Sequence, residues 1–94
     1  MQPQIGGAMP TISTFFGIAI QMFWREHGRP HFHAVYAEHE AIVDIETLGV
    51  VRGSLPRRGM DLVLEWAARH QEALKENWQL CSQLKTPNPI PPLE

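Results

Sequence analysis

Alternating apolar and polar residues between His31 and Thr47 predict an antiparallel β-hairpin. Residues 31–37 and 40–47 each alternate, and Glu38-His39 separates the two runs. Because successive side chains of a strand point to opposite faces, a turn at Glu38-His39 brings one apolar set together. That register pairs Tyr36 with Ala41, Ala34 with Val43 and Phe32 with Ile45, and on the other face it pairs His33 with Asp44 and His31 with Glu46. A slip of one residue would mix apolar and polar positions. Glu-His is a poor two-residue turn, so a four-residue loop of the same parity stays open.

The remaining periodic segments predict further strands and a long helix. Residues 11–24 are β-prone and are interrupted by Gly17, which indicates one bent or bulged strand, and residues 50–53 indicate a short further strand. From about residue 57 to 83, apolar positions recur every three or four residues, at Met60, Val63, Ala67, His70, Leu74, Trp78 and Cys81. This is a helical stripe that exceeds a typical globular helix, so we expect a break near His70.

These elements predict a single α+β domain over residues 9–84. We expect an antiparallel meander of three to four strands, packed on one face by the C-terminal helix. The apolar hairpin face should contact Val63, Ala67 and Leu74. Residues 1–8 contain proline and two glycines and are predicted to be a flexible leader, with Met9 an equally good start for the functional polypeptide. Residues 85–94 hold four prolines and predict an extended tail.

Size and charge limit the function classes that fit the chain. Its 94 residues, 44% of them apolar, suit one small domain. A net charge of −2 and a pI near 6.2 give no overall attraction to nucleic acid, so any such binding needs a local patch. Five of the eight lysines and arginines do fall in one part of the chain, at Arg25, Arg29, Arg52, Arg57 and Arg58.

Cysteine and hydropathy patterns predict a cytoplasmic protein without a membrane segment. Cys81 is the only cysteine, which excludes an internal disulfide and suits a reducing compartment. It lies on the apolar helical stripe, so we expect a small core residue. No apolar run approaches the roughly 18 residues that a membrane-spanning helix needs.

Histidines concentrate the candidate chemistry in one segment. Three of the five lie within seven residues, at His27, His31 and His33. In the predicted hairpin, His31 and His33 share a face with Asp44 and Glu46. Imidazoles and carboxylates of this kind can transfer protons, and they can also bind a metal ion. Plain hydrogen bonds between the two kinds of side chain are the commoner arrangement, so we assign no metal ligands and leave the cofactor unknown.

Six motifs in order resemble one bacterial family. They are Met9–Ser13, Phe16–Ile18, Pro30–His33, Ile42–Glu46, Leu55–Arg58 and Leu64–Trp66. Read together, they resemble the small bacterial proteins known as the domain of unknown function numbered 4160, over roughly residues 9–82. The resemblance implies a stand-alone protein, often encoded beside another small gene in suspected toxin–antitoxin pairs. It places His31, His33, Asp44, Glu46, Arg57 and Arg58 at motif positions, and it puts Ala37 where relatives often have glycine.

Two function hypotheses follow. In the leading one, a toxin–antitoxin component binds or cleaves RNA. His31, His33, Asp44 and Glu46 act as proton-transfer or orienting groups, while Arg29, Arg57 and Arg58 bind phosphate. Arg57 and Arg58 follow Pro56 at a predicted helix N-terminus, which is a natural anion site. In the alternative, the chain has no catalytic activity and binds the small protein that a neighbouring gene encodes.

Overall fold

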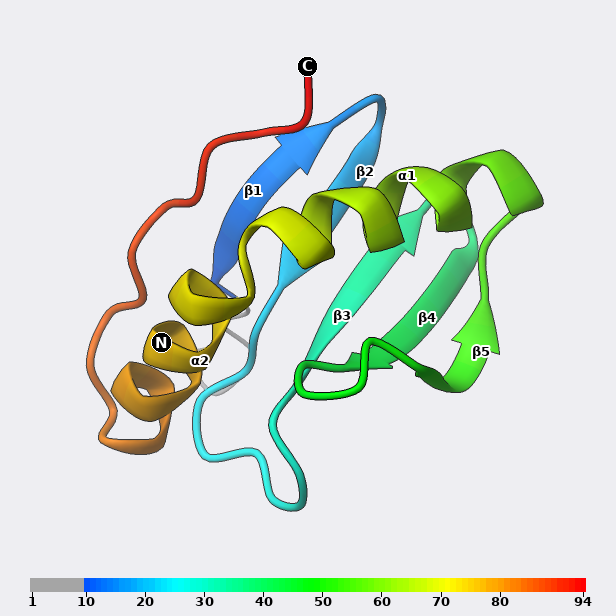
Figure 1. Cartoon of the computed structure of the whole chain (residues 1–94). Coiled ribbons are helices and arrows are strands. Elements are labelled where there is room, and N and C mark those ends of the chain that lie inside the picture. Colours follow the sequence, from blue (N-terminus) through cyan, green and yellow to red (C-terminus); the bar gives the residue numbers. More distant parts are fainter. Residues whose placement is uncertain (1–9) are drawn as a thin grey trace, which may run out of the picture.

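The structure, a computed structural model, describes residues 10–94. The predicted leader and the start at Met9 therefore lie outside the described residues. Five strands precede two helices (Figure 1). The strands are β1 (Thr11–Phe15), β2 (Ile18–Gln21), β3 (His31–Tyr36), β4 (His39–Asp44) and β5 (Val50–Ser54), and the helices are α1 (Arg57–Arg69) and α2 (Gln71–Ser82). The α+β class is confirmed, with one strand more than the predicted three to four.

The sheet is an antiparallel meander in the order β1-β2-β3-β4-β5. The prediction of one bent strand over residues 11–24 is wrong, because Phe16 and Gly17 form a tight turn between β1 and β2. Both residues have positive φ, 52° and 78°. Glycine adopts this conformation without steric cost, so Gly17 marks a hairpin turn here and not a bulge.

The predicted faces of the central hairpin are right, but its register is shifted by two residues. β3 and β4 pair His31 with Asp44, Phe32 with Val43 and Ala34 with Ala41. The turn is therefore Ala37-Glu38, and Ala37 takes a φ of 52°. A shift of two preserves the period of a strand, so every side chain keeps its predicted face. What changes is which polar side chains of the other face lie opposite one another.

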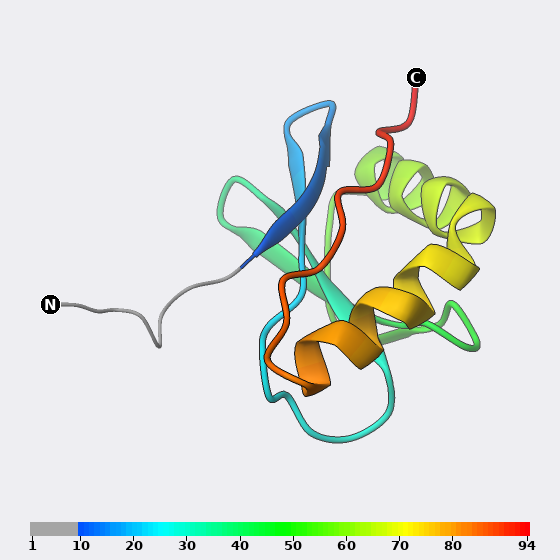
Figure 2. The same ribbon diagram turned by 90° about the vertical axis from the view of Figure 1, so that its left-hand side faces the viewer.

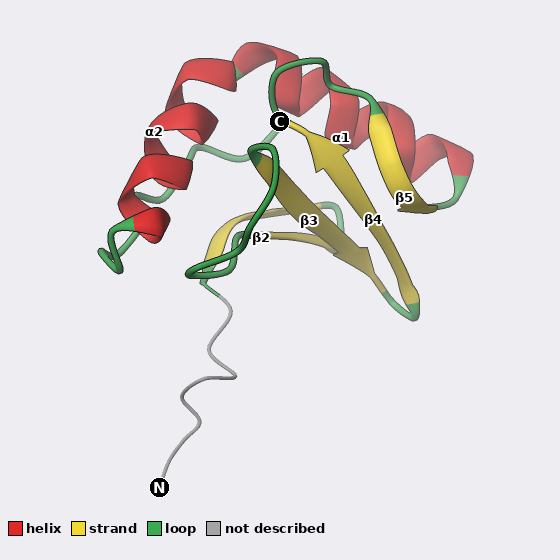
Figure 3. Cartoon of the chain, turned by 90° about the horizontal axis from the view of Figure 1, so that it is seen from below, coloured by secondary structure: helices red, strands yellow, loops and turns green. Residues whose placement is uncertain are grey.

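Both helices cover the same face of the sheet, which we call the inner face (Figures 2 and 3). The apolar side chains of the hairpin and those of the helical stripe form one core there. The fully buried members include Phe32, Ala34, Ala41, Val43, Ile45, Val63, Trp66, Ala67 and Leu74. The break near His70 is confirmed, since α1 ends at Arg69 and α2 begins at Gln71. Cys81 is buried, as expected.

The C-terminal residues 85–94 contain no helix or strand, and they pack against the domain. Ile90 and Leu93 are buried in the core. The Asn77 side chain exchanges two hydrogen bonds with the backbone of Asn88, and the Ile90 N–H donates to the carbonyl oxygen of Ile12 at 2.8 Å. The segment thus runs beside β1, as the orange-to-red trace in Figure 1 shows. One edge of the sheet is covered in this way, whereas β5 at the other edge pairs only with β4.

Candidate functional site

The connection between β2 and β3 folds back over the outer face, the face of the sheet opposite the helices. The Phe23 ring stacks on the His33 ring, with centroids 4.2 Å apart and planes only 7° from parallel. The Trp24 indole N–H donates to the carbonyl oxygen of Lys85 at 3.0 Å, which ties the connection to the segment after α2. Arg25 and Gly28 both have positive φ, so the chain reverses around the two residues between them, Glu26 and His27. The Glu26 side chain consequently reaches β3.

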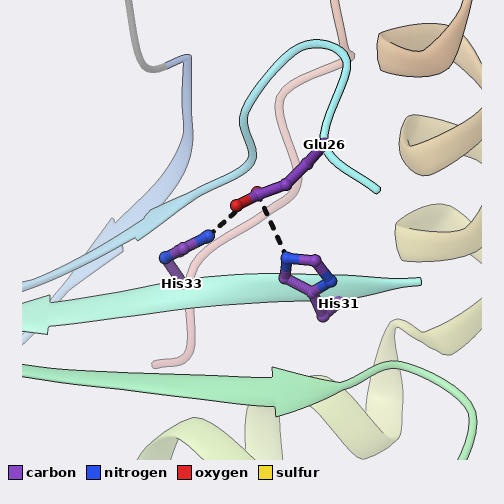
Figure 4. Close-up of side chains that lie close together, drawn as sticks. All are labelled: Glu26, His31 and His33. Carbon is purple, nitrogen blue, oxygen red and sulfur yellow. Dashed lines mark hydrogen bonds and ion pairs between the residues drawn. The ribbon is translucent and has the colours of Figure 1, made fainter. Parts of the chain in front are cut away.

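Four side chains meet on the outer face, and we call them the His–Glu cluster: Glu26, His31, His33 and Glu40. Figure 4 shows the Glu26 carboxylate reaching both imidazoles from the connection. Its Oε1 lies 3.1 Å from Nε2 of His31 and 3.0 Å from Nε2 of His33. The other nitrogen of His33, Nδ1, lies 2.7 Å from Oε2 of Glu40 on β4. Both ring nitrogens of His33 therefore face carboxylate oxygens.

His31 is oriented by the backbone. Its Nδ1 lies 2.8 Å from the carbonyl oxygen of Arg29. A carbonyl oxygen only accepts hydrogen bonds, so Nδ1 must carry a proton. The ring also packs against Trp78 of α2, at 5.0 Å between centroids. His31 thus presents Nε2 to Glu26 in a fixed orientation.

The cluster is enclosed by protein but reachable from solvent. The side chains of His33 and His31 are 6% and 14% exposed, whereas that of Glu26 is 28% exposed. Two open hollows flank it. One is lined by residues that include His27, Arg29, His31 and Arg52, and the other by residues that include Glu26, His33, Glu40 and Arg52. Arg52 therefore borders both hollows, and it forms no ion pair with any carboxylate in residues 10–94.

Asp44 and Glu46 do not contact the two histidines as predicted. Neither carboxylate is bonded to His31 or His33; both contact Arg29 instead. Arg29 Nε donates to Asp44 Oδ2 at 2.6 Å, and Nη2 lies 3.5 Å from Glu46 Oε1. Oδ1 of Asp44 also accepts the backbone N–H groups of Glu46 and Thr47. Asp44 therefore holds the turn after β4 and the loop before β3 together.

Charge and hydrogen bonding keep Asp44 ionised. The hydrogen bond from the Arg29 guanidinium, with the backbone N–H groups of Thr47 and Glu46, holds the pKa of the Asp44 carboxyl well below its usual range, against the opposing effect of burial. The same hydrogen bond raises the pKa of Arg29. Such a carboxylate is a poor proton acceptor, so Asp44 stabilises the site without serving as its base.

Arg57 and Arg58 do not join the cluster. They begin α1, which lies on the inner face. Arg58 lines a separate hollow with Phe16 and Tyr36, and Tyr36 is at the far end of β3 from His31. Five residues of extended strand separate those ends by about 16 Å. The two arginines therefore cannot contact a group bound at His31 and His33.

Glu26 and Glu40 were missed by the sequence analysis. Glu26 directly precedes His27 in the histidine-rich segment, which was a usable signal, but nothing in a nonperiodic loop tells where its side chain points. Glu40 shares the face of His33 in either register, but only the turn at Ala37-Glu38 brings it opposite Val35, next to His33 along the face. Both omissions arise from loop and turn conformation and not from the strand pattern.

Comparison with known proteins identifies the family. No curated protein and no solved structure matches the chain. Within residues 10–94, neither helix is long and apolar enough to cross a membrane. The family model described as "Domain of unknown function (DUF4160)" matches residues 17–79, a span that includes the four residues of the His–Glu cluster and the starts of both helices. Since this match covers more than half of its length, the chain belongs to the DUF4160 family.

Proposed function

We propose that this protein binds RNA on the outer face and cleaves it with the His–Glu cluster. The observation that carries the proposal is the convergence of one partly exposed carboxylate, Glu26, with two oriented imidazoles. They lie beside Arg52, which has no carboxylate partner within residues 10–94. Carboxylates and imidazoles are the usual groups for proton transfer, and guanidinium groups bind phosphate oxygens. Arg52 and His27 replace Arg57 and Arg58 as the phosphate-binding residues.

The reaction that fits these groups is intramolecular transfer of a phosphodiester. The ribose 2′-hydroxyl oxygen attacks phosphorus, and its proton passes to the Glu26 carboxylate. The bond from phosphorus to the 5′ oxygen breaks, and His31 returns a proton to that oxygen. The products are a 2′,3′-cyclic phosphate and a free 5′-hydroxyl, so atoms and charge balance without a further reactant. His33, with both nitrogens bonded to carboxylates, positions Glu26.

The resemblance to the DUF4160 family implies a role in suspected toxin–antitoxin pairs, and that role supports RNA as the substrate. Such a component would act in a bacterial cytoplasm, where the single cysteine Cys81 stays reduced. The overall charge of −2 supplies no attraction, so RNA binding rests on the local group of Arg25, His27, Arg29 and Arg52. We therefore expect weak binding that falls steeply with salt.

The test is cleavage of a defined RNA by the purified full chain, in the presence of a chelator. Glu26→Gln keeps the shape of the side chain and removes the base, and it should lower the rate by about 100-fold or more. Glu65→Gln, at an exposed glutamate of α1, is the matched control and should leave the rate unchanged. Arg52→Ala should weaken RNA binding, whereas Arg58→Ala should not. Intact RNA after long incubation, or equal rates for both glutamate variants, would overturn the proposal.

A second candidate function, binding of a neighbouring gene's small protein without catalysis, is favoured by the β5 edge. All five residues of β5 are exposed, Val51 to 65%. An unpaired edge strand can accept a strand from a partner. Co-expression should then yield a complex that Val51→Lys disrupts and Leu84→Lys, at an exposed apolar side chain outside the sheet, leaves intact. A complex that forms equally with both variants would exclude this edge.

A further inference from the structure

Neutral imidazoles and ionised carboxylates supply too few protons for the contacts that the His–Glu cluster makes. His31 Nδ1 must be protonated, because its partner is the carbonyl oxygen of Arg29. The other three contacts, two at Glu26 and one at Glu40, each pair an imidazole nitrogen with a carboxylate oxygen. Each of those pairs needs a proton or a metal ion between its two atoms, because two lone pairs would otherwise face each other. With protons alone and both carboxylates ionised, both imidazoles would have to carry two protons each.

One divalent ion satisfies the same set with neutral imidazoles. If His31 and His33 are each protonated on Nδ1, His31 donates to Arg29 and His33 donates to Glu40. The two Nε2 atoms and the Glu26 carboxylate oxygen then lie within 4.8 Å of one another with no proton between them. We propose that Glu26, His31 and His33 form a binding site for a divalent transition-metal ion such as Zn²⁺.

The spacing of the three ligand atoms fits such an ion. Neighbouring ligands about 2.0–2.1 Å from an ion in tetrahedral or octahedral geometry lie about 2.8–3.4 Å from one another. Glu26 Oε1 is 3.1 Å from the Nε2 atom of His31 and 3.0 Å from that of His33, and all three residues offer ligand atoms within 4.8 Å of one another. Only a small closure of the two rings would complete the site.

The surrounding contacts are those that metal-binding histidines usually make. A ligating histidine generally donates its second ring N–H to a carboxylate or a backbone carbonyl, which sets the tautomer and the ring orientation. His33 has Glu40 in this position, at 2.7 Å, and His31 has the Arg29 carbonyl, at 2.8 Å. These partners come from β4 and from the loop before β3, so they are independent of the three ligands.

Two imidazoles and one carboxylate favour particular ions. The set contains no thiolate, and it suits Zn²⁺, Co²⁺ or Fe²⁺ better than Ca²⁺ or Mg²⁺, which prefer oxygen ligands. Three protein ligands leave coordination positions open toward the two flanking hollows. Open positions are typical of sites whose ion binds a further small ligand.

The ion site stands independently of the RNA proposal, and one consequence rests on that proposal. An ion bound to Glu26 and His31 occupies the atoms that would move protons during RNA cleavage. Saturating Zn²⁺ should therefore abolish cleavage, and a chelator should restore it. Cleavage that instead required the ion would overturn this competition.

The experiment is titration of the chelator-treated full chain with Zn²⁺, followed by calorimetry and by competition with a chromophoric chelator. We expect one ion per chain and a higher Tm with Zn²⁺. Glu26→Gln and His31→Gln should each weaken binding by 10-fold or more, and Glu40→Gln should weaken it less. Glu65→Gln, at an exposed glutamate of α1, is the matched control and should bind normally.

Each outcome bears on one proposal. Failure of the wild-type chain to bind Zn²⁺, or an equal loss in Glu26→Gln and Glu65→Gln, would overturn the ion site. Because Glu26 is partly exposed, Glu26→Gln should fold normally, and its circular dichroism would verify this. RNA cleavage without Zn²⁺ binding would overturn the ion site alone, whereas Zn²⁺ binding without RNA cleavage would overturn the proposed function alone.

Discussion

On its inner face β3 contributes Phe32 and Ala34 to an apolar core, whereas on its outer face the same strand contributes His31 and His33 to a cluster with Glu26 and Glu40. On β3 itself, Phe32, Ala34 and His33 are buried and His31 is partly buried. The inner set is stabilised by removal of apolar surface from water, which requires no particular partner. The outer set is stable only if each polar atom has its own partner, because a buried polar group without one is costly.

This difference between the two faces of the sheet indicates where a functional site is to be sought. An apolar face tolerates shifts in register as long as parity is kept. A buried polar face depends on the placement of individual atoms, so its presence in a small protein calls for a reason other than stability. Substitutions on the two faces test this distinction through their effects on stability.

Phe32→Ala should have the largest effect on stability. Phe32 is fully buried and packs edge-on against Trp66, at 5.9 Å between ring centroids. Loss of a buried ring leaves a cavity and should lower the free energy of unfolding by about 3–5 kcal/mol, as measured by denaturant titration. Val35→Ala, on the outer face of the same strand, should cost about 1 kcal/mol or less. Similar losses for the two variants would contradict the distinction between the faces.

Gly53→Ala should disturb the outer face through the backbone. Gly53 has a φ of 73°, and a Cβ there would overlap the Glu40 carbonyl oxygen. The clash should lower the free energy of unfolding by about 1–3 kcal/mol and displace Glu40 from His33.

The control for Gly53 is Gly28→Ala. Gly28 also has a positive φ, 95°, but a Cβ there meets nothing within 4 Å. Its substitution isolates the backbone strain and should cost about 1 kcal/mol. If thermal unfolding shows equal losses at the two positions, the close approach to Glu40 is unimportant.

Asp44→Asn should lower stability in a pH-dependent way and by less than Phe32→Ala does. Asparagine keeps the oxygen that accepts backbone N–H groups but loses the charge that faces Arg29. Because the folded-state pKa of Asp44 lies below its unfolded value, its charge contributes stability that is fully present above the usual carboxyl range and is lost as the pH falls through the folded value.

The measurement is the Tm of both proteins between pH 7 and pH 3. The difference should be constant down to about pH 5 and should shrink below about pH 4. A difference that grew toward low pH would show that the Arg29–Asp44 pair is not its source.

Ala37→Gly should have the smallest effect, and it should be stabilising. Ala37 holds a φ of 52° in the turn between β3 and β4, and a non-glycine residue pays for this conformation with steric strain. Glycine removes the strain but gains freedom in the unfolded chain, so the net gain should be about 0.5–1 kcal/mol. Glu38→Gly, at the neighbouring turn position with ordinary φ, should not stabilise the chain. A loss of stability in Ala37→Gly would indicate that the turn differs from the one described.

Most of the fold was predictable from local patterns. The period of two in residues 31–47 assigned Phe32 and Val43 correctly to one face, and the helical period located both the stripe and its break at His70. The errors lie at turns. The pattern predicts a bulge at Gly17, where the chain turns, and it predicts the turn between β3 and β4 one position too late. Apolar periodicity does not indicate which residue adopts a positive φ.

The two histidines of the candidate site were predictable from the strand pattern, whereas their partners depend on turns and on tertiary packing. His31 and His33 were identified because adjacent odd positions of one strand must share a face. Asp44 and Glu46 were assigned to them through the shifted register, whereas the structure gives these two carboxylates to Arg29. Arg57 and Arg58 were assigned by motif and by their place at a helix N-terminus, and the packing of α1 on the inner face separates them from the cluster.

Periodicities of two and 3.6 residues therefore specify which face of each strand is apolar, where the helices lie and that His31 and His33 share a face. Only the tertiary structure decided that Glu26 and Glu40 are their partners. That outcome depends on two backbone reversals, at Arg25–Gly28 and at Ala37, and on the stacking of Phe23 on His33, which bring side chains together across loops that carry no periodic pattern.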